Sequence, residues 1–272
     1  MKLHFFGVRG STPAPGADFA RYGGHTSCVG VIPDGAPGPT VVLDAGTGLR
    51  SVSEHVDGPG FRGTILLTHL HLDHVMGIPF FEKGDHPASD VDVFLPSQNG
   101  DTGRDLMARW LGPPTFPITP EELLGAWRFH AIEPGGFVAD GLEVRAFEIE
   151  HKGGRTYGYR IDSGAESVAY LPDHTQVARR SPETDAILRD VAVLIHGAQY
   201  LDTEKEIADD YGHCTISEVI QVATDVGAGR LVLFHHAPAR SDDELDELGR
   251  WVTASMPVLL AREGMTIRAD RM

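Results

Sequence analysis

The stretch Thr-His-Leu-His-Leu-Asp-His at residues 68–74 places four potential metal ligands within six residues: His69, His71, Asp73 and His74. Side chains alternate along a strand, so His69 and His71 point the same way where the apolar run at 63–68 ends. A turn into a helix would then direct the next two ligands at a neighbouring point. Neutral imidazole and carboxylate groups suit zinc, iron or manganese. We therefore expect a metal centre here rather than a histidine-rich loop that binds no metal.

Further ligands are expected at the ends of other strands, because one segment rarely completes a metal site. Polar residues follow four more apolar runs in the second half of the chain. A lone histidine at a strand end is more often structural than a ligand, but four such residues beside the 69–74 cluster favour ligands. They are His151 after residues 142–149, Asp173 after 167–171, His196 after 191–195 and His235 after 231–234.

Short apolar runs separated by turns predict many strands with helices outside them. Further strands are expected at residues 3–8, 40–44, 63–68, 91–95 and 156–161, and helices at 49–56, 102–111, 181–189, 215–226 and 242–255. The proline-rich segment 113–120 predicts an ordered surface loop or lid, with a plain connector as the alternative. Since no repeat or linker interrupts the sequence, one domain over residues 1–272 is the simplest arrangement.

Charge and cysteine content limit the class of protein. The formal net charge of −16 argues against broad binding to nucleic-acid backbones, which requires a basic surface. Two divalent cations would nevertheless make the site locally positive.

Cys28 and Cys214 are too few for a disulfide framework, and isolated thiols fit a reducing cytoplasm; a single bridge between them is the less favoured alternative. No run approaches the roughly 20 apolar residues that cross a bilayer, so no membrane partner is expected.

The candidate ligands together resemble the metallo-β-lactamase superfamily, whose α/β fold is an αββα sandwich of two packed mixed sheets flanked by helices. The similarity covers nearly the whole chain. Asp44, in Leu-Asp-Ala-Gly-Thr-Gly, is similar to the first motif of the family, where the aspartate orients the histidine loop. The resemblance implies one metal held by His69, His71 and His151 and another by Asp73, His74 and His235, with Asp173 bridging both.

Three further stretches are similar to one branch of that superfamily, the tRNA 3′-processing and phosphonate-pathway phosphodiesterases. They are residues 7–13 with 22–28, residues 157–161, and residues 193–198 followed by 212–215. In that branch the histidine at the position of His213 stands beside the scissile phosphate and aids the leaving oxygen. The alternative for His213 is a residue at a helix start, with Thr215 capping the helix nearby.

The chain departs from this branch at two positions. Gly197 stands where an acidic residue is usual, so the partner that would orient His213 is open. His25 stands where asparagine is common, and it either supports the ligands or is a turn residue, which we slightly favour.

The interval between His151 and Asp173 is short. Members that process tRNA carry a protruding arm between these two motifs, whereas here they are 22 positions apart (173 minus 151), which two strands and a turn fill. The missing arm and the acidic composition argue for a small phosphodiester such as a cyclic nucleotide, or a short oligonucleotide end, and against a large nucleic acid. Candidate phosphate contacts are Arg9, Lys152 and Arg155, with ordinary surface charges as the alternative.

These patterns predict a dinuclear metal-dependent phosphodiesterase that uses a metal-bound hydroxide. The catalytic roles fall to His213 and Asp73, and Zn²⁺ is favoured over Mn²⁺ or Fe. Three alternatives stay open: a thioester or lactam hydrolase with the same metals, a tRNA or oligonucleotide 3′-end nuclease, and a binding or scaffold protein that has lost catalysis. Dimers are common in the resembling branch, so a homodimer is a further alternative to a monomer.

Overall fold

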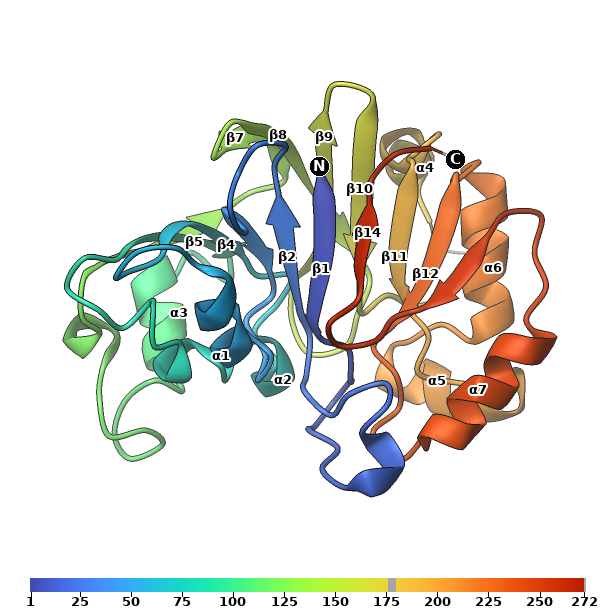
Figure 1. Cartoon of the computed structure of the whole chain (residues 1–272), viewed down its shortest axis with the longest axis horizontal. Helices are drawn as coiled ribbons and strands as arrows, with labels where there is room; N and C mark the ends of the chain where they lie inside the picture. The colour runs from blue at the N-terminus through green and yellow to red at the C-terminus, as the bar shows by residue number, and fades with distance from the viewer. Residues whose placement is uncertain (176–179, 272) are drawn as a thin grey trace.

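Two seven-stranded sheets pack face to face in the computed structural model, which describes residues 1–175 and 180–271 (Figure 1). The first sheet has the strand order β14 (Thr266–Arg268), β1 (Lys2–Gly7), β2 (Cys28–Ile32), β3 (Val41–Leu43), β4 (Arg62–Leu66), β5 (Asp90–Pro96) and β6 (Ala126–Ile132). The second sheet has the order β13 (Val258–Leu260), β12 (Arg230–Phe234), β11 (Val193–Gly197), β10 (Glu166–Leu171), β9 (Thr156–Ser163), β8 (Leu142–Ile149) and β7 (Gly135–Ala139).

Both sheets are mixed. In the first sheet the strands from β14 to β3 are antiparallel and those from β3 to β6 are parallel. The second sheet is parallel from β13 to β10 and antiparallel from β10 to β7. The C-terminal strand β14 returns to the first sheet, where Ile267 pairs with Leu3 of β1. The two ends of the chain are therefore joined in one sheet.

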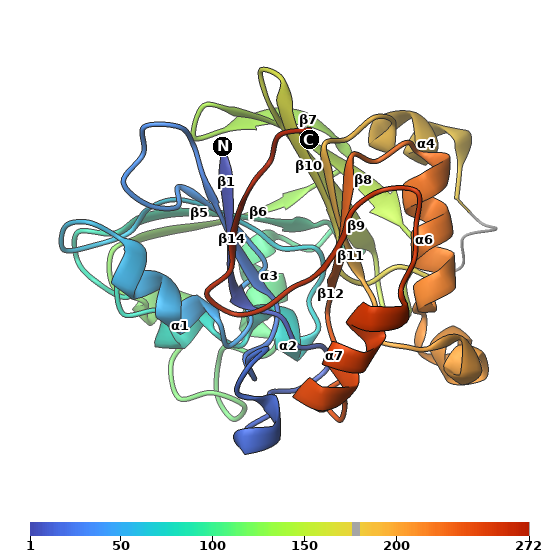
Figure 2. The same ribbon diagram turned by 45° about the vertical axis from the view of Figure 1, so that its right-hand side comes forward.

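Helices cover the outer face of each sheet. The first sheet is covered by α1 (Leu49–Val52), α2 (Leu72–Val75) and α3 (Gly103–Ala108). Figure 2 shows α4 (Pro182–Leu188), α6 (Ile216–Asp225) and α7 (Asp242–Trp251) outside the second sheet, and α5 (Lys205–Tyr211) precedes α6 in the chain. Short 3₁₀ turns lie at Ala17–Phe19, Ser53–His55, Ile78–Phe80, Pro120–Glu122 and Asp202–Glu204.

In the part of the chain that the structure describes, apolar side chains form three buried clusters, one between the sheets and one outside each sheet. The cluster between the sheets takes inward-facing residues from both, such as Phe5 and Phe234, whose ring centroids are 6.1 Å apart. Removing these side chains from water is the main force that holds the layers together. Cys28 lies in the cluster outside the first sheet and Cys214 in the cluster outside the second, so the two buried thiols are free.

The strand directions bring several chain segments to one edge of the second sheet. Strands β10, β11 and β12 are parallel, and β8 runs the same way because it is antiparallel to β9, which is antiparallel to β10. The carboxyl ends of all four strands therefore lie at the same edge. The residues that follow them, among them His151, Asp173 and His235, are gathered there.

The fold class predicted from the sequence is confirmed, with differences in detail. The expected strand at 142–149 has the bounds of β8, and two strands with a turn fill the interval from His151 to Asp173, as expected. The sequence patterns did not indicate β2, β6, β7, β13, β14 or α5, which have short or weakly alternating apolar runs. In the proline-rich segment, Phe116 contacts Phe80 with ring centroids 5.8 Å apart and packs on the outer core of the first sheet. None of the helices in the described residues is long and apolar enough to cross a membrane.

Candidate metal centre

The histidine loop leaves the end of β4 and turns directly into α2. His69 and His71 lie in the extended segment, and Asp73 and His74 lie in the single helical turn Leu72–Val75. The backbone N–H of Thr68 donates a hydrogen bond of 2.7 Å to Asp44, which fixes the start of the loop. The change from strand to helix therefore divides the four candidate ligands into two pairs, as the sequence predicted.

One group of potential ligand atoms comes from His69, His71, His151 and Asp173, and all its atoms lie within 4.8 Å of one another. Asp173 Oδ2 is 3.3 Å from His69 Nε2 and 3.4 Å from His151 Nε2. His151 Nε2 is also 3.4 Å from His71 Nδ1. Atoms bound to a tetrahedral zinc at about 2.0–2.1 Å lie about 3.3–3.4 Å apart, so this group has the spacing of a zinc site.

A second group comes from Asp73, His74 and His235. Asp73 Oδ2 is 3.2 Å from the Nε2 atoms of both His74 and His235. Asp173 reaches this group as well, with Oδ1 3.0 Å from His235 Nε2 and Oδ2 3.4 Å from His74 Nε2. Asp173 is thus in contact with both groups, which is the position expected of a bridging carboxylate.

In His151 and His69, the hydrogen-bond partner of Nδ1 shows that the lone pair is on Nε2. His151 Nδ1 lies 2.7 Å from the carbonyl oxygen of Gly212, and His69 Nδ1 lies 3.0 Å from Thr68 Oγ1, whose own proton goes to Asp44. Each Nδ1 therefore donates, and each Nε2 directs a lone pair at a carboxylate. His69 Nε2 and Asp173 Oδ1 are buried without a hydrogen-bond partner. Acceptors that face acceptors at this distance repel one another unless a cation lies between them, so the residues fit divalent metal ions.

The pKa values also indicate a site that attracts positive charge. Burial alone would raise the pKa of Asp173, but His235, His74 and His151 hold it well below its usual range. Burial alone would lower the pKa of His74, but Asp73, Asp44 and Asp173 raise it well above its usual value. The carboxylates therefore stay charged and require cations beside them, whether protons on imidazole or metal ions.

The segment at residues 7–13 packs against the second ligand group. A side chain on Gly10 would place its Cβ 2.3 Å from His235 Nδ1, so only glycine lets the backbone approach that ring. The next residue, Ser11, donates its backbone N–H to Asp73 Oδ2 at 2.7 Å. Residues 7–13, which resemble the phosphodiesterase branch, therefore hold His235 and Asp73 in position.

His213 lies beside both ligand groups. Its ring centroid is 5.0 Å from that of His151 and 5.6 Å from that of His235, and the residue is 8% exposed. Burial lowers the pKa of His213 to about 3, so the imidazole is neutral near pH 7. The alternative interpretation of this segment, a helix start, is confirmed, because Thr215 is the N-cap of α6 in a capping box with Glu218. The catalytic role of His213 stays a prediction.

The acidic partner expected for His213 has no room at position 197. A Cβ on Gly197 would lie 1.8 Å from the carbonyl oxygen of Pro172, so no side chain fits there. Among the described residues, the His213 ring has contacts with other rings, including Tyr200 at 5.5 Å between centroids, but no hydrogen bond. Packing against rings therefore orients His213, whose ligand nitrogen lies within 4.8 Å of the Asp173 carboxylate.

Several other candidates from the sequence do not join the ligand groups. His196 is buried 3.2 Å from His174 rather than among the ligands, and His25 is hydrogen-bonded to Thr47 Oγ1 at 3.2 Å. Arg9 is fully buried and donates hydrogen bonds to the carbonyl oxygens of Gly23, Ala237 and Arg240. The prediction that Arg9 contacts phosphate is wrong, because its guanidinium is already bound within the fold.

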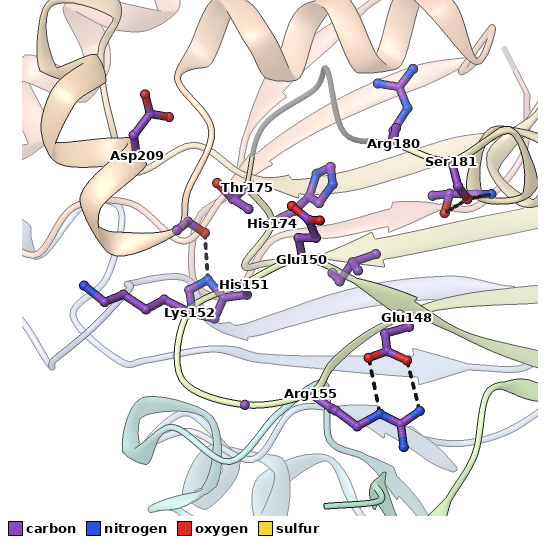
Figure 3. A pocket seen from close by; sticks show the side chains of 14 residues that line it. Glu148, Glu150, His151, Lys152, Arg155, His174, Thr175, Arg180, Ser181 and Asp209 are labelled. Carbon is purple, nitrogen blue, oxygen red and sulfur yellow. Dashed lines mark hydrogen bonds and ion pairs between the residues drawn. The ribbon is translucent and has the colours of Figure 1, made fainter.

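A cleft of about 760 Å³ opens beside His151 (Figure 3). Lys152 and Arg155 line it, but Lys152 Nζ donates to the carbonyl oxygen of Asp210 at 2.7 Å and Arg155 is paired with Glu148 at 2.9 Å. A smaller cavity of about 350 Å³ borders the other side of the centre. It is lined by His69 and His71 together with Gln98, Asn99, Arg109 and Trp110, and no sequence motif indicated the last four.

Comparison with known proteins decides the family. A sequence model described as the beta-lactamase superfamily domain matches residues 40–236, well over half of the chain. The chain belongs to the metallo-β-lactamase superfamily. It is a metal-dependent hydrolase of this superfamily, and the resemblance to the phosphodiesterase branch is confirmed.

Relatives and solved structures agree with this family. Ribonuclease Z of Bradyrhizobium diazoefficiens is 29% identical over 269 aligned positions, which cover 77% of this chain and 84% of the relative. The human short-form tRNase Z superposes with a TM-score of 0.71 at 19% identity and covers 99% of each chain. A diphosphatase of the PhnP family gives a TM-score of 0.73 at 18% identity, covering 98% of this chain and 96% of that one. The two structural likenesses concern the fold alone.

Proposed function

We propose that this superfamily member is a dinuclear metal-dependent phosphodiesterase, one domain over residues 1–272, that hydrolyses a small phosphodiester such as a cyclic nucleotide. The observation that carries the proposal is one arrangement of side chains. Asp173 contacts both groups of candidate ligands, and His213 lies beside both groups, with its ligand nitrogen within 4.8 Å of those of Asp173 and His235.

The ligand atoms fit two divalent cations, with Zn²⁺ favoured and Mn²⁺ or Fe as alternatives, because imidazole and carboxylate suit all three. When bound, such a pair of cations would polarise a phosphate oxygen and lower the pKa of a water molecule towards neutrality. Asp173 would hold both cations, and Asp73, fixed by the N–H of Ser11, would hold the second.

Hydrolysis forms a bond from phosphorus to a water oxygen and breaks the bond to the leaving alkoxide, which takes up a proton. His213 is the side chain placed to assist the leaving oxygen, since its ring is 8% exposed and faces the rings of His151 and His235. An imidazole N–H that donates a hydrogen bond to the leaving oxygen stabilises its developing negative charge. His213 is therefore the proposed catalytic residue contributed by the loop before α6.

The proposed substrate is small because the basic side chains that line the cleft within residues 1–175 and 180–271 are already paired with carboxylates or a carbonyl oxygen. The interval where an arm would be inserted is filled by β9 and β10. The alignment with the Bradyrhizobium ribonuclease Z is 269 positions long but spans only 77% of the 272 residues of this chain. The alignment is therefore longer than the part of this chain that it spans, so the relative has residues without a counterpart here. In the cleft, the guanidinium of Arg155 is neutralised by Glu148 and Glu133. A long polyanion would require several free cationic side chains.

A second candidate is a nuclease that acts on the 3′ end of tRNA or of an oligonucleotide. It is favoured by the names of the relatives, which include several ribonucleases Z, and by the fold of human tRNase Z. In that case the substrate would reach the centre with its 3′ end only, and its body would bind elsewhere on the surface.

A substrate panel with the zinc-loaded protein distinguishes these candidates. We expect hydrolysis of cyclic nucleotides and of an aryl phosphodiester, and no cleavage of precursor tRNA or of a thioester. The Asp173→Ala variant should lose both metals and all activity. The control variant is Asp162→Ala, because Asp162 lies on β9 and is paired with Arg160; it should keep the metals and the activity. A kcat/KM for precursor tRNA above that for every small diester would replace the proposal by the nuclease, and hydrolysis of the thioester alone would overturn both.

A further inference from the structure

One more group of potential ligands has no residue in common with the groups around Asp173. It consists of His174, His196 and Cys214, whose ligand atoms all lie within 4.8 Å of one another. The three residues are 4%, 0% and 1% exposed. Neither the proposed phosphodiesterase mechanism nor the motifs of the sequence use them together.

The geometry of the three side chains is that of a ligand set. His174 Nδ1 is 3.2 Å from His196 Nε2 and 3.9 Å from Cys214 Sγ. Nitrogen and sulfur atoms bound to a tetrahedral zinc at about 2.0–2.3 Å lie about 3.3–3.8 Å apart. The observed distances are within a few tenths of an ångström of these values, so small side-chain rotations would complete the coordination.

The orientation of His196 supports the same conclusion. Its Nδ1 lies 3.0 Å from the carbonyl oxygen of Gly197 and donates to it, which leaves the lone pair on Nε2 directed at the cluster. A metal-bound histidine commonly donates its other N–H to a backbone carbonyl in this way. Within the described part of the chain, Cys214 Sγ has only the His174 ring as a polar contact, and no other group there accepts the thiol proton.

We propose that His174, His196 and Cys214 bind a third metal ion, Zn²⁺, in a mononuclear site separate from the two groups that share Asp173. Imidazole with thiolate is a donor set that selects zinc over the harder cations. His174 also lines the cleft of Figure 3 with Thr175, so water from the cleft would supply the fourth ligand.

The site would connect three segments that carry the proposed catalytic groups. His174 follows Asp173 after β10, His196 lies within β11, and Cys214 follows His213 before α6. One ion bound to all three would restrict the positions of Asp173 and His213 relative to each other. Its expected role is therefore structural, and its loss should lower the melting temperature as well as the metal content.

Cobalt substitution tests this site without any activity assay. The seven residues of the two other groups supply only nitrogen and oxygen, so a thiolate-to-cobalt charge-transfer absorption in the protein loaded with Co²⁺ reports the third site alone. We expect this absorption in the wild type, its complete loss in Cys214→Ser, and its retention in Cys28→Ser, which replaces the other buried thiol. Zinc content should fall by one ion per chain in Cys214→Ser and stay unchanged in Cys28→Ser.

The absence of a thiolate-to-cobalt absorption in the folded wild type, or its survival in Cys214→Ser, would overturn the proposal. If Cys214→Ser does not fold, X-ray absorption of the zinc-loaded wild type decides instead. The proposal requires one sulfur neighbour for every three zinc ions, and a spectrum without any sulfur neighbour would overturn it. These measurements are independent of the substrate panel, so failure of the phosphodiesterase proposal and failure of the third site are distinguishable.

Discussion

Asp44 accepts a hydrogen bond of 2.7 Å from His74 Nδ1, and neither side chain is exposed to solvent. The same carboxylate accepts hydrogen bonds from the backbone and hydroxyl of Thr68 and from the hydroxyl of Tyr170. Asp44 also has a positive φ of 57°, an uncommon conformation for aspartate that is held by these contacts. It therefore fixes both the start of the histidine loop and the direction of the His74 lone pair.

Replacement of Asp44 by Asn should weaken metal binding without removing a ligand. The amide can donate to His74 Nδ1, which would place the ring proton on Nε2 and turn an N–H towards Asp73 and Asp173. Loss of such a supporting partner lowers metal affinity by about 10–100-fold. Titration with a metal-buffered indicator measures the change. Tyr170→Phe, which removes one hydrogen bond but keeps the carboxylate, should change the affinity much less, and equal affinities in D44N and the wild type would contradict this role.

His213→Ala should lower kcat and leave the bound metals in place. The His213 ring contacts the candidate ligands His151 and His235, and its ligand nitrogen lies within 4.8 Å of the ligand atoms of Asp173 and His235. The group of His69, His71, His151 and Asp173 and the group of Asp73, His74 and His235 are nevertheless formed without it. Loss of a group that assists proton transfer or the leaving oxygen lowers the rate by about 10²–10⁴-fold. Steady-state kinetics combined with metal analysis checks both parts. His130→Ala, on β6 and paired with Asp92, is the matched control and should retain kcat; loss of a metal ion in H213A would make His213 a ligand instead.

Arg9→Met should destabilise the fold rather than weaken substrate binding. The guanidinium is fully buried, and its removal would take away the donor to the carbonyl oxygens of Gly23 and Arg240 and the cation paired with Asp242. Breaking a buried pair by removal of one partner costs about 3–5 kcal/mol of unfolding free energy. Denaturant titration measures this loss. Arg21→Met, at an exposed arginine that pairs with Asp243 and Asp246, should cost less than about 1 kcal/mol; similar midpoints for the two variants would count against the structural role.

His4 should contribute to acid destabilisation. Burial and the neighbouring His55 lower the pKa of His4 from 6.5 to about 4. Between these values the unfolded chain binds more protons at this position than the folded chain, so the free energy of unfolding falls as the pH falls from about 6.5 to about 4. After allowance for partial exposure of the ring, the loss is on the order of 1 kcal/mol.

The measurement for His4 is the slope of stability against pH in metal-free protein, so that release of metal does not contribute. His4→Gln should have a shallower slope than the wild type across this range, because glutamine does not titrate. The variant keeps a hydrogen-bonding group near Thr266 Oγ1, which lies 2.7 Å from His4 Nδ1. Parallel slopes in the two proteins would refute the assignment.

The candidate ligand groups could be predicted from the sequence because their signals are local. His69, His71, Asp73 and His74 are adjacent in the chain, and the turn from strand to helix determines which of them share a face. His151, Asp173 and His235 each follow an apolar run, and the family resemblance assigned them to positions that the structure brings together. His196 has the same local signal and lies elsewhere, which shows the limit of that reasoning.

The sequence by itself determined the kinds of candidate ligand, their spacing and the superfamily. Only the tertiary structure decided that Arg9 is buried, that Gly197 has no room for a side chain beside Pro172, and that His174, His196 and Cys214 meet. The physical reason is the range of the interactions. The direction of a side chain along a strand or helix depends on a few neighbours, whereas its partner depends on strand order and on packing between residues far apart in the chain.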